Sequence, residues 1–150
     1  MTTQITPNPV GPFTLAPGTD DTEGLAPNGA TTLDALALLD PDTRARTVAP
    51  HHALRGPHLA FGEGEQMRLL RLDRDITHIG RGPDAAVCID EYRVSRDHAI
   101  LVRHGRFFRL LDNRSSNGTY VNGRRIVAVG VASGDLIELG PVRVRFVEVA

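Results

Sequence analysis

Residues 142–149 read VRVRFVEV, a stretch in which apolar and charged side chains alternate. Val142, Val144 and Phe146 fall on one side of this alternation, and Arg143 and Arg145 fall on the other. Successive residues of a β-strand point to opposite faces of its sheet, so a period of two predicts a strand that is buried on one face only. We therefore expect this segment to cover a core with its apolar face and to meet solvent with its arginines.

From about residue 58 onward, the chain consists of short apolar runs rich in β-branched and aromatic residues, a composition typical of strands. Two runs, AILVR and FFRLL, carry apolar residues on both faces, which predicts strands lying between a core and a covering layer. Turn sequences such as RGPD, RHGR and ASGD separate the runs. Many short strands without a helical stretch between them predict an all-β fold, an antiparallel β-sandwich of about 10–11 strands over residues 58–149. The remaining runs are MRLLRL, ITHIG, AVCI, TYV, RRIV and DLIEL.

Residues 1–57 have a different composition, rich in proline and threonine and poor in apolar periodicity. Such a segment cannot bury enough apolar surface to offset the entropy cost of ordering, so we expect a largely disordered, flexible N-terminal tail. One exception is TTLDALALLDPD, where Thr32 is placed to cap a short helix over residues 32–39 and Pro41 follows its end. A helix this short is not stable alone and must either dock on the sandwich or remain nascent.

Composition excludes several classes of protein. At 150 residues the chain has room for one domain with a core, and Cys88, its single cysteine, rules out an intrachain disulfide. We find no signal-peptide pattern at the start and no apolar run of membrane-spanning length, which predicts a soluble cytoplasmic protein without a membrane partner. The net charge is −3 for residues 1–57 and +2 for residues 58–150, too small to favour nucleic acid.

Three loop stretches place polar residues at the ends of predicted strands: IGRGPD at 79–84, YRVSRDH at 92–98 and RSSNGTYVNG at 114–123. Loops at one end of a sandwich lie close together although they are distant in sequence. The three stretches can therefore converge on one site.

In this order and spacing, the three stretches resemble the forkhead-associated (FHA) domain, a phosphothreonine-binding β-sandwich. The resemblance covers about residues 58–149. It implies a non-catalytic adaptor of Ser/Thr kinase signalling that binds a phosphothreonine protein or peptide and needs neither a cofactor nor a metal. It is carried by Gly80-Arg81, by Ser95 with His98 three residues later, by Ser116-Asn117-Gly118-Thr119 and by Val121-Asn122-Gly123.

The resemblance assigns phosphate binding to Arg81 and Ser95, and to Ser116 a role in holding the phosphate or its loop. A phosphothreonine carries close to two negative charges and three acceptor oxygens, so its receptor needs a fixed cation and several short donors. Arg81 supplies the cation, Ser95 supplies its hydroxyl and its backbone N–H, and Ser116 supplies its hydroxyl. Arg96, next to Ser95, is either a second cation or a solvated side chain.

Three further residues are expected to read the peptide around the phosphothreonine. The resemblance assigns to Asn117 the side-chain amide that bonds the peptide backbone, since an amide offers a donor and an acceptor together. Arg93 lies where the family commonly reads the residue three after the phosphothreonine, and as a hypothesis it favours an acidic residue there. Arg114 stands where the family often has glycine, and it either extends a basic rim or points to water.

The remaining motif residues are expected to shape the loops. Gly80 and Gly118 fit tight passages of the backbone, and Asn122-Gly123 fits a hairpin turn between TYV and RRIV. The pattern Ser95-x-x-His98 also suggests a nucleophile and a base, but no orienting acid or oxyanion hole accompanies it. The resemblance instead makes His98 a structural residue that holds the serine segment, and we predict that the protein is not an enzyme.

Two alternatives concern regulation and mode of binding. Thr19 and Thr22 lie in the acidic sequence GTDDTEG and are candidate phosphorylation sites for a Ser/Thr protein kinase, after which the domain would bind its own tail. The competing interpretation is an unmodified tail. A phosphate-independent protein–protein interaction domain, which holds a partner through a sheet face, is the alternative to phosphopeptide binding.

Overall fold

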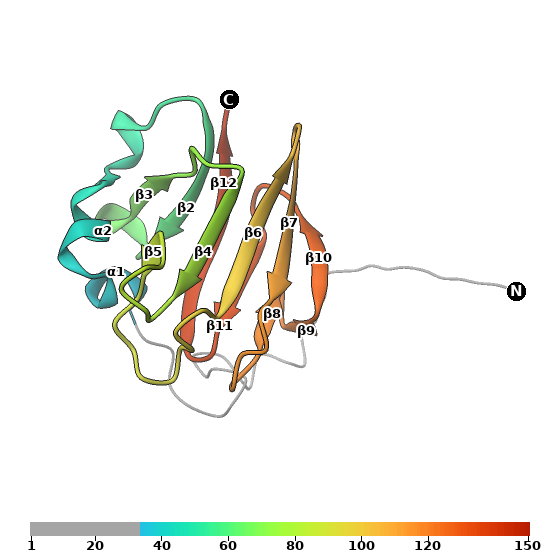
Figure 1. Ribbon diagram of the computed structural model, residues 1–150. Helices are drawn as coiled ribbons and strands as arrows, with labels where there is room; N and C mark the ends of the chain where they lie inside the picture. The colour runs from blue at the N-terminus through green and yellow to red at the C-terminus, as the bar shows by residue number, and fades with distance from the viewer. Residues whose placement is uncertain (1–33) are drawn as a thin grey trace, which may run out of the picture.

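The segment 142–149 forms β12 (Val142–Val149), a central strand of one of two β-sheets in the computed structural model, which describes residues 34–150 (Figure 1). Val142, Val144 and Phe146 are buried, whereas Arg145 is exposed and Arg143 is partly exposed. The predicted alternation is therefore confirmed, and it sets the strand's inner face against the core.

The described residues form a sandwich of a seven-stranded and a five-stranded sheet, in agreement with the predicted all-β class (Figure 1). In sheet order, the seven strands are β1 (Thr47–Val48), β3 (Arg68–Arg71), β2 (Gly56–Phe61), β12, β11 (Leu136–Leu139), β8 (Thr119–Val121) and β9 (Arg124–Ile126). The five strands are β10 (Ala128–Val131), β7 (Phe107–Asp112), β6 (Ala99–His104), β4 (Ile76–Gly80) and β5 (Val87–Cys88).

Strand pairing is antiparallel except between β4 and β5, which run parallel with Ile79 opposite Val87. The sequence pattern located most strands but missed β1, β2 and β10. Gly56 and Pro57 disguise the start of β2, and the glycine in AVGV weakens the strand signal of β10.

The core lies between the two sheets and joins residues that are far apart in sequence. Phe108 of β7 and Phe146 of β12 face each other across it, with ring centroids 5.0 Å apart at an interplanar angle of 52°, an arrangement that aromatic pairs favour. Cys88 is 9% exposed, and burial raises the pKa of its thiol, as expected for a core cysteine rather than a reactive one. Fully buried aliphatic residues complete this core: Leu59, Ile79, Ile89, Leu110, Ile137 and Leu139.

The predicted helix at 32–39 differs from the structure in its extent and its cap. Helix α1 (Ala35–Leu38) starts after Asp34, whose carboxylate accepts a hydrogen bond from the amide of Leu36. Pro41 follows the end of α1 as predicted, but it also begins a second helix, α2 (Pro41–Ala45), capped by Asp40. Both departures follow local capping chemistry, since aspartate is a strong N-cap and proline suits the first helical turn.

The predicted boundary between residues 57 and 58 does not coincide with an edge of the packed structure. Ala35 and Leu39 are buried in the core, and Leu39 forms a β-bridge with Ile89. The segment after α2 continues through β1 and a 3₁₀ helix (η2, Pro50–His52), and a second 3₁₀ helix (η3, Gly64–Gln66) precedes β3. The short helices therefore dock, as one of the two sequence-based alternatives required. The remainder of the predicted tail, with Thr19, Thr22 and Thr32, lies outside the described residues.

Within residues 34–150, no helix is long and apolar enough to cross a membrane. The same residues hold no cluster of three or more His, Cys, Asp or Glu side chains suited to a metal ion.

Candidate functional site

The three predicted loop stretches meet at one end of the sandwich, the lower end in Figure 1. The loop after β4 bonds to the segment before β6, because Arg81 N donates to Ser95 O (2.9 Å) and Gly82 N donates to Arg96 O (2.9 Å). The loop between β7 and β8 joins them through Ser116 N, which donates to Ser95 Oγ at 3.0 Å. The convergence expected from the sequence is therefore present.

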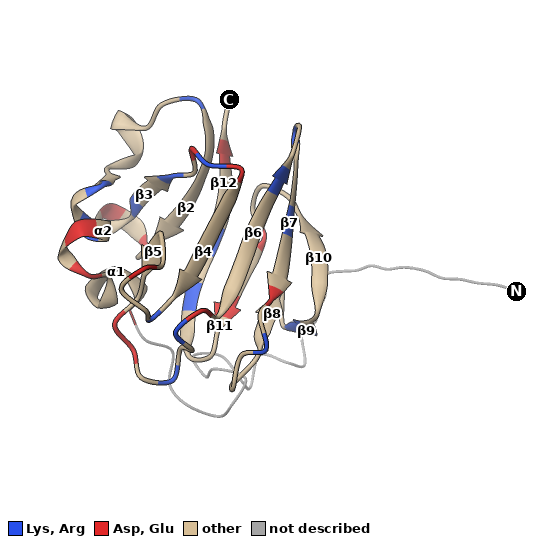
Figure 2. Ribbon diagram, viewed as in Figure 1, with Lys and Arg blue, Asp and Glu red and all other residues tan. Residues whose placement is uncertain are grey.

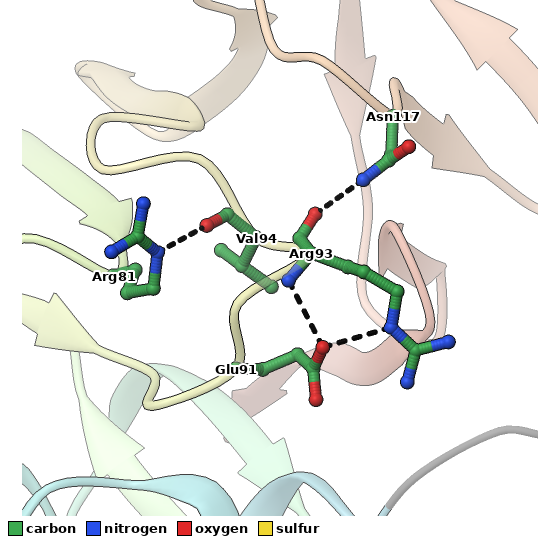
Figure 3. Close-up of polar contacts among 5 residues, drawn as sticks. All are labelled: Arg81, Glu91, Arg93, Val94 and Asn117. Carbon is green, nitrogen blue, oxygen red and sulfur yellow. Dashed lines mark hydrogen bonds and ion pairs between the residues drawn. The ribbon is translucent and has the colours of Figure 1, made fainter.

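Arg81 stands where the backbone of β4 passes very close to a second loop. A Cβ atom on Gly80 would overlap the backbone carbonyl of Arg96, so only glycine fits at this point. The exposed Arg81 side chain is fixed at Nε, which donates to Val94 O at 3.0 Å (Figure 3). Among the described residues, no hydrogen bond is found for its two terminal nitrogens, which Figure 3 shows turned away from Val94. Arg81 is thus a positioned cation with a free fork of donors.

His98 is completely buried and connects two of the loops. Its Nδ1 accepts a hydrogen bond from Ser95 N (2.9 Å), so Nε2 carries the proton and donates to Gly118 O (2.8 Å). Burial is the main cause that lowers the pKa of His98, and it outweighs the opposing effects of Gly118 O and Asp112. The neutral ring therefore holds the serine segment, and its Nδ1 is bonded to the backbone of Ser95 rather than to the hydroxyl.

Asp112 organises the loop between β7 and β8, a role that the sequence analysis missed. Its Oδ1 accepts hydrogen bonds from Thr119 Oγ1 (2.7 Å) and from Ser115 Oγ, and its Oδ2 accepts one from Ser115 N (3.2 Å). Burial alone would raise the pKa of Asp112, but the bonds from Ser115 and Thr119 lower it below its usual range. An aspartate at a strand end with a serine three residues later is a turn signal that could have indicated this role.

Asn117 lies between the loops, and its amide has a partner within the protein. Asn117 Nδ2 donates to Arg93 O at 2.7 Å, which ties the loop after β7 to the segment that carries Ser95 (Figure 3). The opposite end of the amide, Oδ1, points away from Arg93 in Figure 3. The side chain that was expected to bond a peptide therefore also holds the two loops together.

Arg93 is paired with Glu91, a partner that the sequence analysis did not consider. Its backbone N and its Nε both donate to Glu91 Oε1, at 3.0 and 2.9 Å (Figure 3). Glu91 is 8% exposed; burial opposes its ionisation, but the bonds from Arg93 outweigh burial and lower its pKa. Part of the positive charge of Arg93 is thus neutralised before any ligand arrives.

Exposed arginines surround these loops. Arg96 lies beside a surface hollow of about 490 Å³ that is also lined by Pro83 and Asp97. Arg114 is exposed and has a φ of 57°, a left-handed conformation that glycine adopts more readily. The guanidinium of Arg125 on β9 lies next to Gly118. Figure 2 shows blue, arginine-bearing segments of the backbone at the lower end of the sandwich, where the loops meet.

Asn122-Gly123 forms the predicted hairpin turn and lies outside this loop cluster. Both residues have positive φ, 52° and 85°, and they connect paired residues Val121 and Arg124 of β8 and β9, as a type I′ turn requires. Asn122 Nδ2 donates to Asp135 Oδ1 (3.1 Å), and its Oδ1 accepts from Leu136 N (3.0 Å). The pair therefore supports the neighbouring strand β11.

The chain is similar to proteins of one family. The family model for the FHA domain matches residues 77–140. The glycogen accumulation regulator GarA of Mycobacterium tuberculosis is 38% identical over 120 residues, which cover 75% of this chain and 74% of GarA.

Two solved structures have the same fold. One comes from a study of phosphothreonine-dependent FHA domain interactions and is 29% identical, with a TM-score of 0.56 over 63% of this chain and 98% of that domain. The other is Mycobacterium tuberculosis EmbR in complex with a low affinity phosphopeptide, 31% identical, with a TM-score of 0.58 over 73% of this chain and 28% of EmbR. With its sandwich, its converging loops and a relative that matches most of its length, the chain belongs to the FHA domain family.

Proposed function

We propose that this protein binds phosphothreonine peptides at the cluster of Arg81, Ser95 and Ser116 and acts as a non-catalytic adaptor in Ser/Thr kinase signalling. The observation that carries the proposal is Arg81, whose Nε donates to Val94 O while its terminal nitrogens bond none of the residues that the structure describes. Its backbone N donates to Ser95 O, and Ser95 Oγ in turn accepts from Ser116 N. A fixed guanidinium can donate two parallel hydrogen bonds to a phosphate without first losing side-chain freedom. Similarity to an FHA domain with phosphothreonine-dependent interactions supports the same function.

The neighbouring residues receive roles that follow from their free atoms. Ser95 and Ser116 offer hydroxyl groups to phosphate oxygens, and Arg96 adds a second cation at the rim. Asn117 offers Oδ1 to a peptide N–H, while one N–H of its Nδ2 donates to Arg93 O. Arg93 keeps its terminal nitrogens for an acidic peptide residue, although its bond to Glu91 weakens that preference.

The geometry argues against hydrolysis at Ser95. A base must accept the proton of the nucleophile, but His98 Nδ1 accepts from the backbone N–H of Ser95 and Nε2 donates to Gly118 O. Both ring nitrogens are therefore engaged elsewhere, which supports binding rather than catalysis.

Isothermal titration calorimetry with a phosphothreonine peptide, its unphosphorylated form and a phosphoserine form tests the proposal. Hydrogen bonds to a charged group contribute roughly 1.5 to 3 kcal/mol each, so Arg81→Ala should weaken binding of the phosphothreonine peptide at least tenfold. Arg74→Ala is the matched control, since Arg74 is an exposed arginine before β4 rather than after it. Equal affinity for phosphorylated and unphosphorylated peptides would instead support phosphate-independent binding and reject this proposal.

The chain's own tail is a second candidate ligand within the same function. Thr19 and Thr22 lie among acidic residues in GTDDTEG, and exposed arginines such as Arg96 and Arg114 surround the proposed site. A tethered phosphothreonine has an effective concentration near millimolar, sufficient to close a weak site. Kinase-treated protein should then lose affinity for added phosphopeptide, and replacing both threonines with alanine should restore it; unchanged affinity after phosphorylation would exclude this switch.

A further inference from the structure

The two sheets have four edge strands, and only one of the four described edges lacks protection. Edge strands expose unpaired backbone groups, which proteins normally guard with charge, proline, short length or a covering segment. Strand β1 has two residues, β9 carries Arg124 and Arg125, and β5 has two residues. Strand β5 is also covered, because Leu39 bridges Ile89 and Asp40 N donates to Cys88 O (3.1 Å).

Strand β10 is protected by none of these features, except that its length is modest. It lies in the run IVAVGVA, residues 126–132, which contains neither a charged residue nor a proline. Val127, at the start of this edge, is 83% exposed, the highest value among the exposed large hydrophobic residues described. An exposed edge without charge or proline is a template for another strand.

The hydrogen-bonding pattern identifies the backbone groups that face outward. Val127 O accepts from Asp112 N at 2.9 Å, so the polar groups of Val127 point toward β7. Because these groups alternate in direction along a strand, Val129 and Val131 also bond to β7, with Leu110 and Phe108 opposite them. The N–H and C=O groups of Ala128 and Gly130 therefore face the open side.

The open edge begins next to the proposed phosphopeptide site. Val127 is bonded to Asp112, and Asp112 holds the loop that carries Ser116 and Asn117. In Figure 1, β10 rises from the same lower end of the sandwich where the loops meet. A chain anchored by its phosphothreonine would thus have this edge within reach of a short linker, since an extended residue spans roughly 3.3 Å.

We propose that the open edge of β10 binds an extended apolar segment of the same phosphorylated partner chain by β-strand addition. This inference rests on the proposed phosphothreonine site, which supplies the anchor. Ala128 and Gly130 bond the main chain of the added strand, and β-branched side chains of that strand lie beside Val127. The edge offers few backbone groups, so it adds affinity only for a chain that is already bound through its phosphothreonine and is not an independent binding site.

Three synthetic peptides test the proposal on the full-length protein. The first is a short phosphothreonine peptide; the second adds a Gly/Ser linker and an alternating Val/Thr segment; the third replaces that segment with Ser and Asn. The linker and segment are placed before the phosphothreonine in one set and after it in another. From the effective concentration of a tethered segment, we expect the second peptide to bind about fivefold tighter than the first in one of the two sets, and the third to bind like the first.

Val127→Lys should reduce the affinity for the second peptide to that for the first and leave the first unchanged. Ile76→Lys is the matched control, because Ile76 is another exposed apolar residue of the same sheet that lies away from the open edge. Amide hydrogen exchange provides a backbone readout: only the second peptide should slow exchange at Ala128 and Gly130, which a side-chain contact alone would not do.

The outcomes separate this inference from the proposed function. If the short peptide binds and the extended peptide binds no tighter in either set, the edge proposal fails and the phosphothreonine site stands. If no phosphopeptide binds, both fail. A dimer in sedimentation velocity that Val127→Lys converts to a monomer would assign the edge to a second copy of the chain and overturn the proposal.

Discussion

The two Asn-Gly pairs of this protein share a dipeptide but differ in almost every contact. Asn117-Gly118 lies in the loop cluster, where Asn117 bonds Arg93 O and Gly118 O accepts from His98. Asn122-Gly123 lies in a hairpin, and both of its residues have positive φ. In the first pair only Gly118 has positive φ, 87°. One pair is therefore built by contacts between distant loops and the other by the turn itself.

This difference teaches that a turn motif takes its role from the residues that hold it. The hairpin needs left-handed backbone, and its asparagine then braces β11. The loop pair needs a buried histidine and an aspartate, His98 and Asp112, supplied by other parts of the chain. We expect substitutions at the first pair to affect ligand binding and those at the second pair to affect stability alone.

The largest expected effect is that of His98→Ala. The change leaves a cavity and removes the partners of Ser95 N and Gly118 O, which together should cost about 3 to 5 kcal/mol of unfolding free energy. Phosphopeptide affinity should fall as well, because the serine segment loses its support. Chemical denaturation measures the first effect, and His78→Ala, which removes an exposed histidine, is the control. A loss below 1 kcal/mol would show that His98 does not hold the loops.

Gly118→Ala and Gly123→Ala compare the two turns directly. Gly118 has a φ of 87° and Gly123 has a φ of 85°, so both variants carry the strain of a left-handed alanine, about 1 kcal/mol. At Gly118 the new Cβ would also lie 3.0 Å from Arg125 Nε and 3.1 Å from Tyr120 Cε1, whereas at Gly123 no atom of residues 34–150 lies within 4 Å of it. Gly118→Ala should therefore be more destabilising, by about 1 kcal/mol. Equal thermal denaturation midpoints would contradict this difference.

Asn117→Ala and Asn122→Ala should separate binding from stability. Asn122→Ala removes two hydrogen bonds, to Asp135 and Leu136, and should cost about 1 kcal/mol of stability with unchanged phosphopeptide affinity. Asn117→Ala removes the bond to Arg93 and the Oδ1 acceptor, so affinity should fall about tenfold. Calorimetry and denaturation on both variants provide the comparison, and an affinity loss in Asn122→Ala as large as that in Asn117→Ala would contradict it.

Acid should loosen the loop cluster before it affects the hairpin. His98 has a lowered pKa in the folded state, so its contribution to stability is present above the unfolded value of about 6.5 and is lost as pH falls below it. Asp112 also has a lowered pKa, and its contribution disappears as pH falls below about 4. Buried His58, whose pKa burial lowers, adds to the first stage. Chemical denaturation at several pH values should show the free energy of unfolding falling in these two pH ranges. In His98→Ala the fall near pH 6 should be less steep. A free energy of unfolding that does not depend on pH would refute the assignment.

The smallest effect concerns Arg114, whose φ of 57° resembles that of Asn122. Arg114→Gly relieves the left-handed strain and should stabilise the protein by about 0.5 kcal/mol. Asn122→Gly should instead destabilise it, because asparagine tolerates this conformation and its two hydrogen bonds are lost. Differential scanning calorimetry of both variants tests the contrast, which disappears if both midpoints shift in the same direction.

Most of the sandwich could be predicted because the burial of one face of a strand is visible as an alternation of apolar and polar residues within that strand. The alternation in VRVRFVEV is visible within eight residues, and it correctly assigns Val144 to the core and Arg145 to the surface. Strand β10 was missed because Ala128 and Gly130 lie within it and weaken its strand signal, and its place as an edge depends on pairing with β7. The helical segment was placed approximately, but capping by Asp34 and Asp40 moved its boundaries.

By itself, the sequence determined the all-β class and the hairpin at Asn122-Gly123, since each depends on local periodicity or on turn chemistry. The roles expected for the loop residues came from the resemblance of three loop stretches to the FHA domain. Only the tertiary structure decided which atoms of those residues remain free. Arg93 Nε donates a hydrogen bond to Glu91, and Arg93 O accepts one from the side-chain amide of Asn117. Arg81 Nε donates a hydrogen bond to Val94 O. The physical reason is that a donor's availability depends on which acceptors lie within about 3 Å of it. Glu91 is two residues from Arg93, but Arg93 O and Val94 O lie 24 and 13 residues from the side chains that they hold.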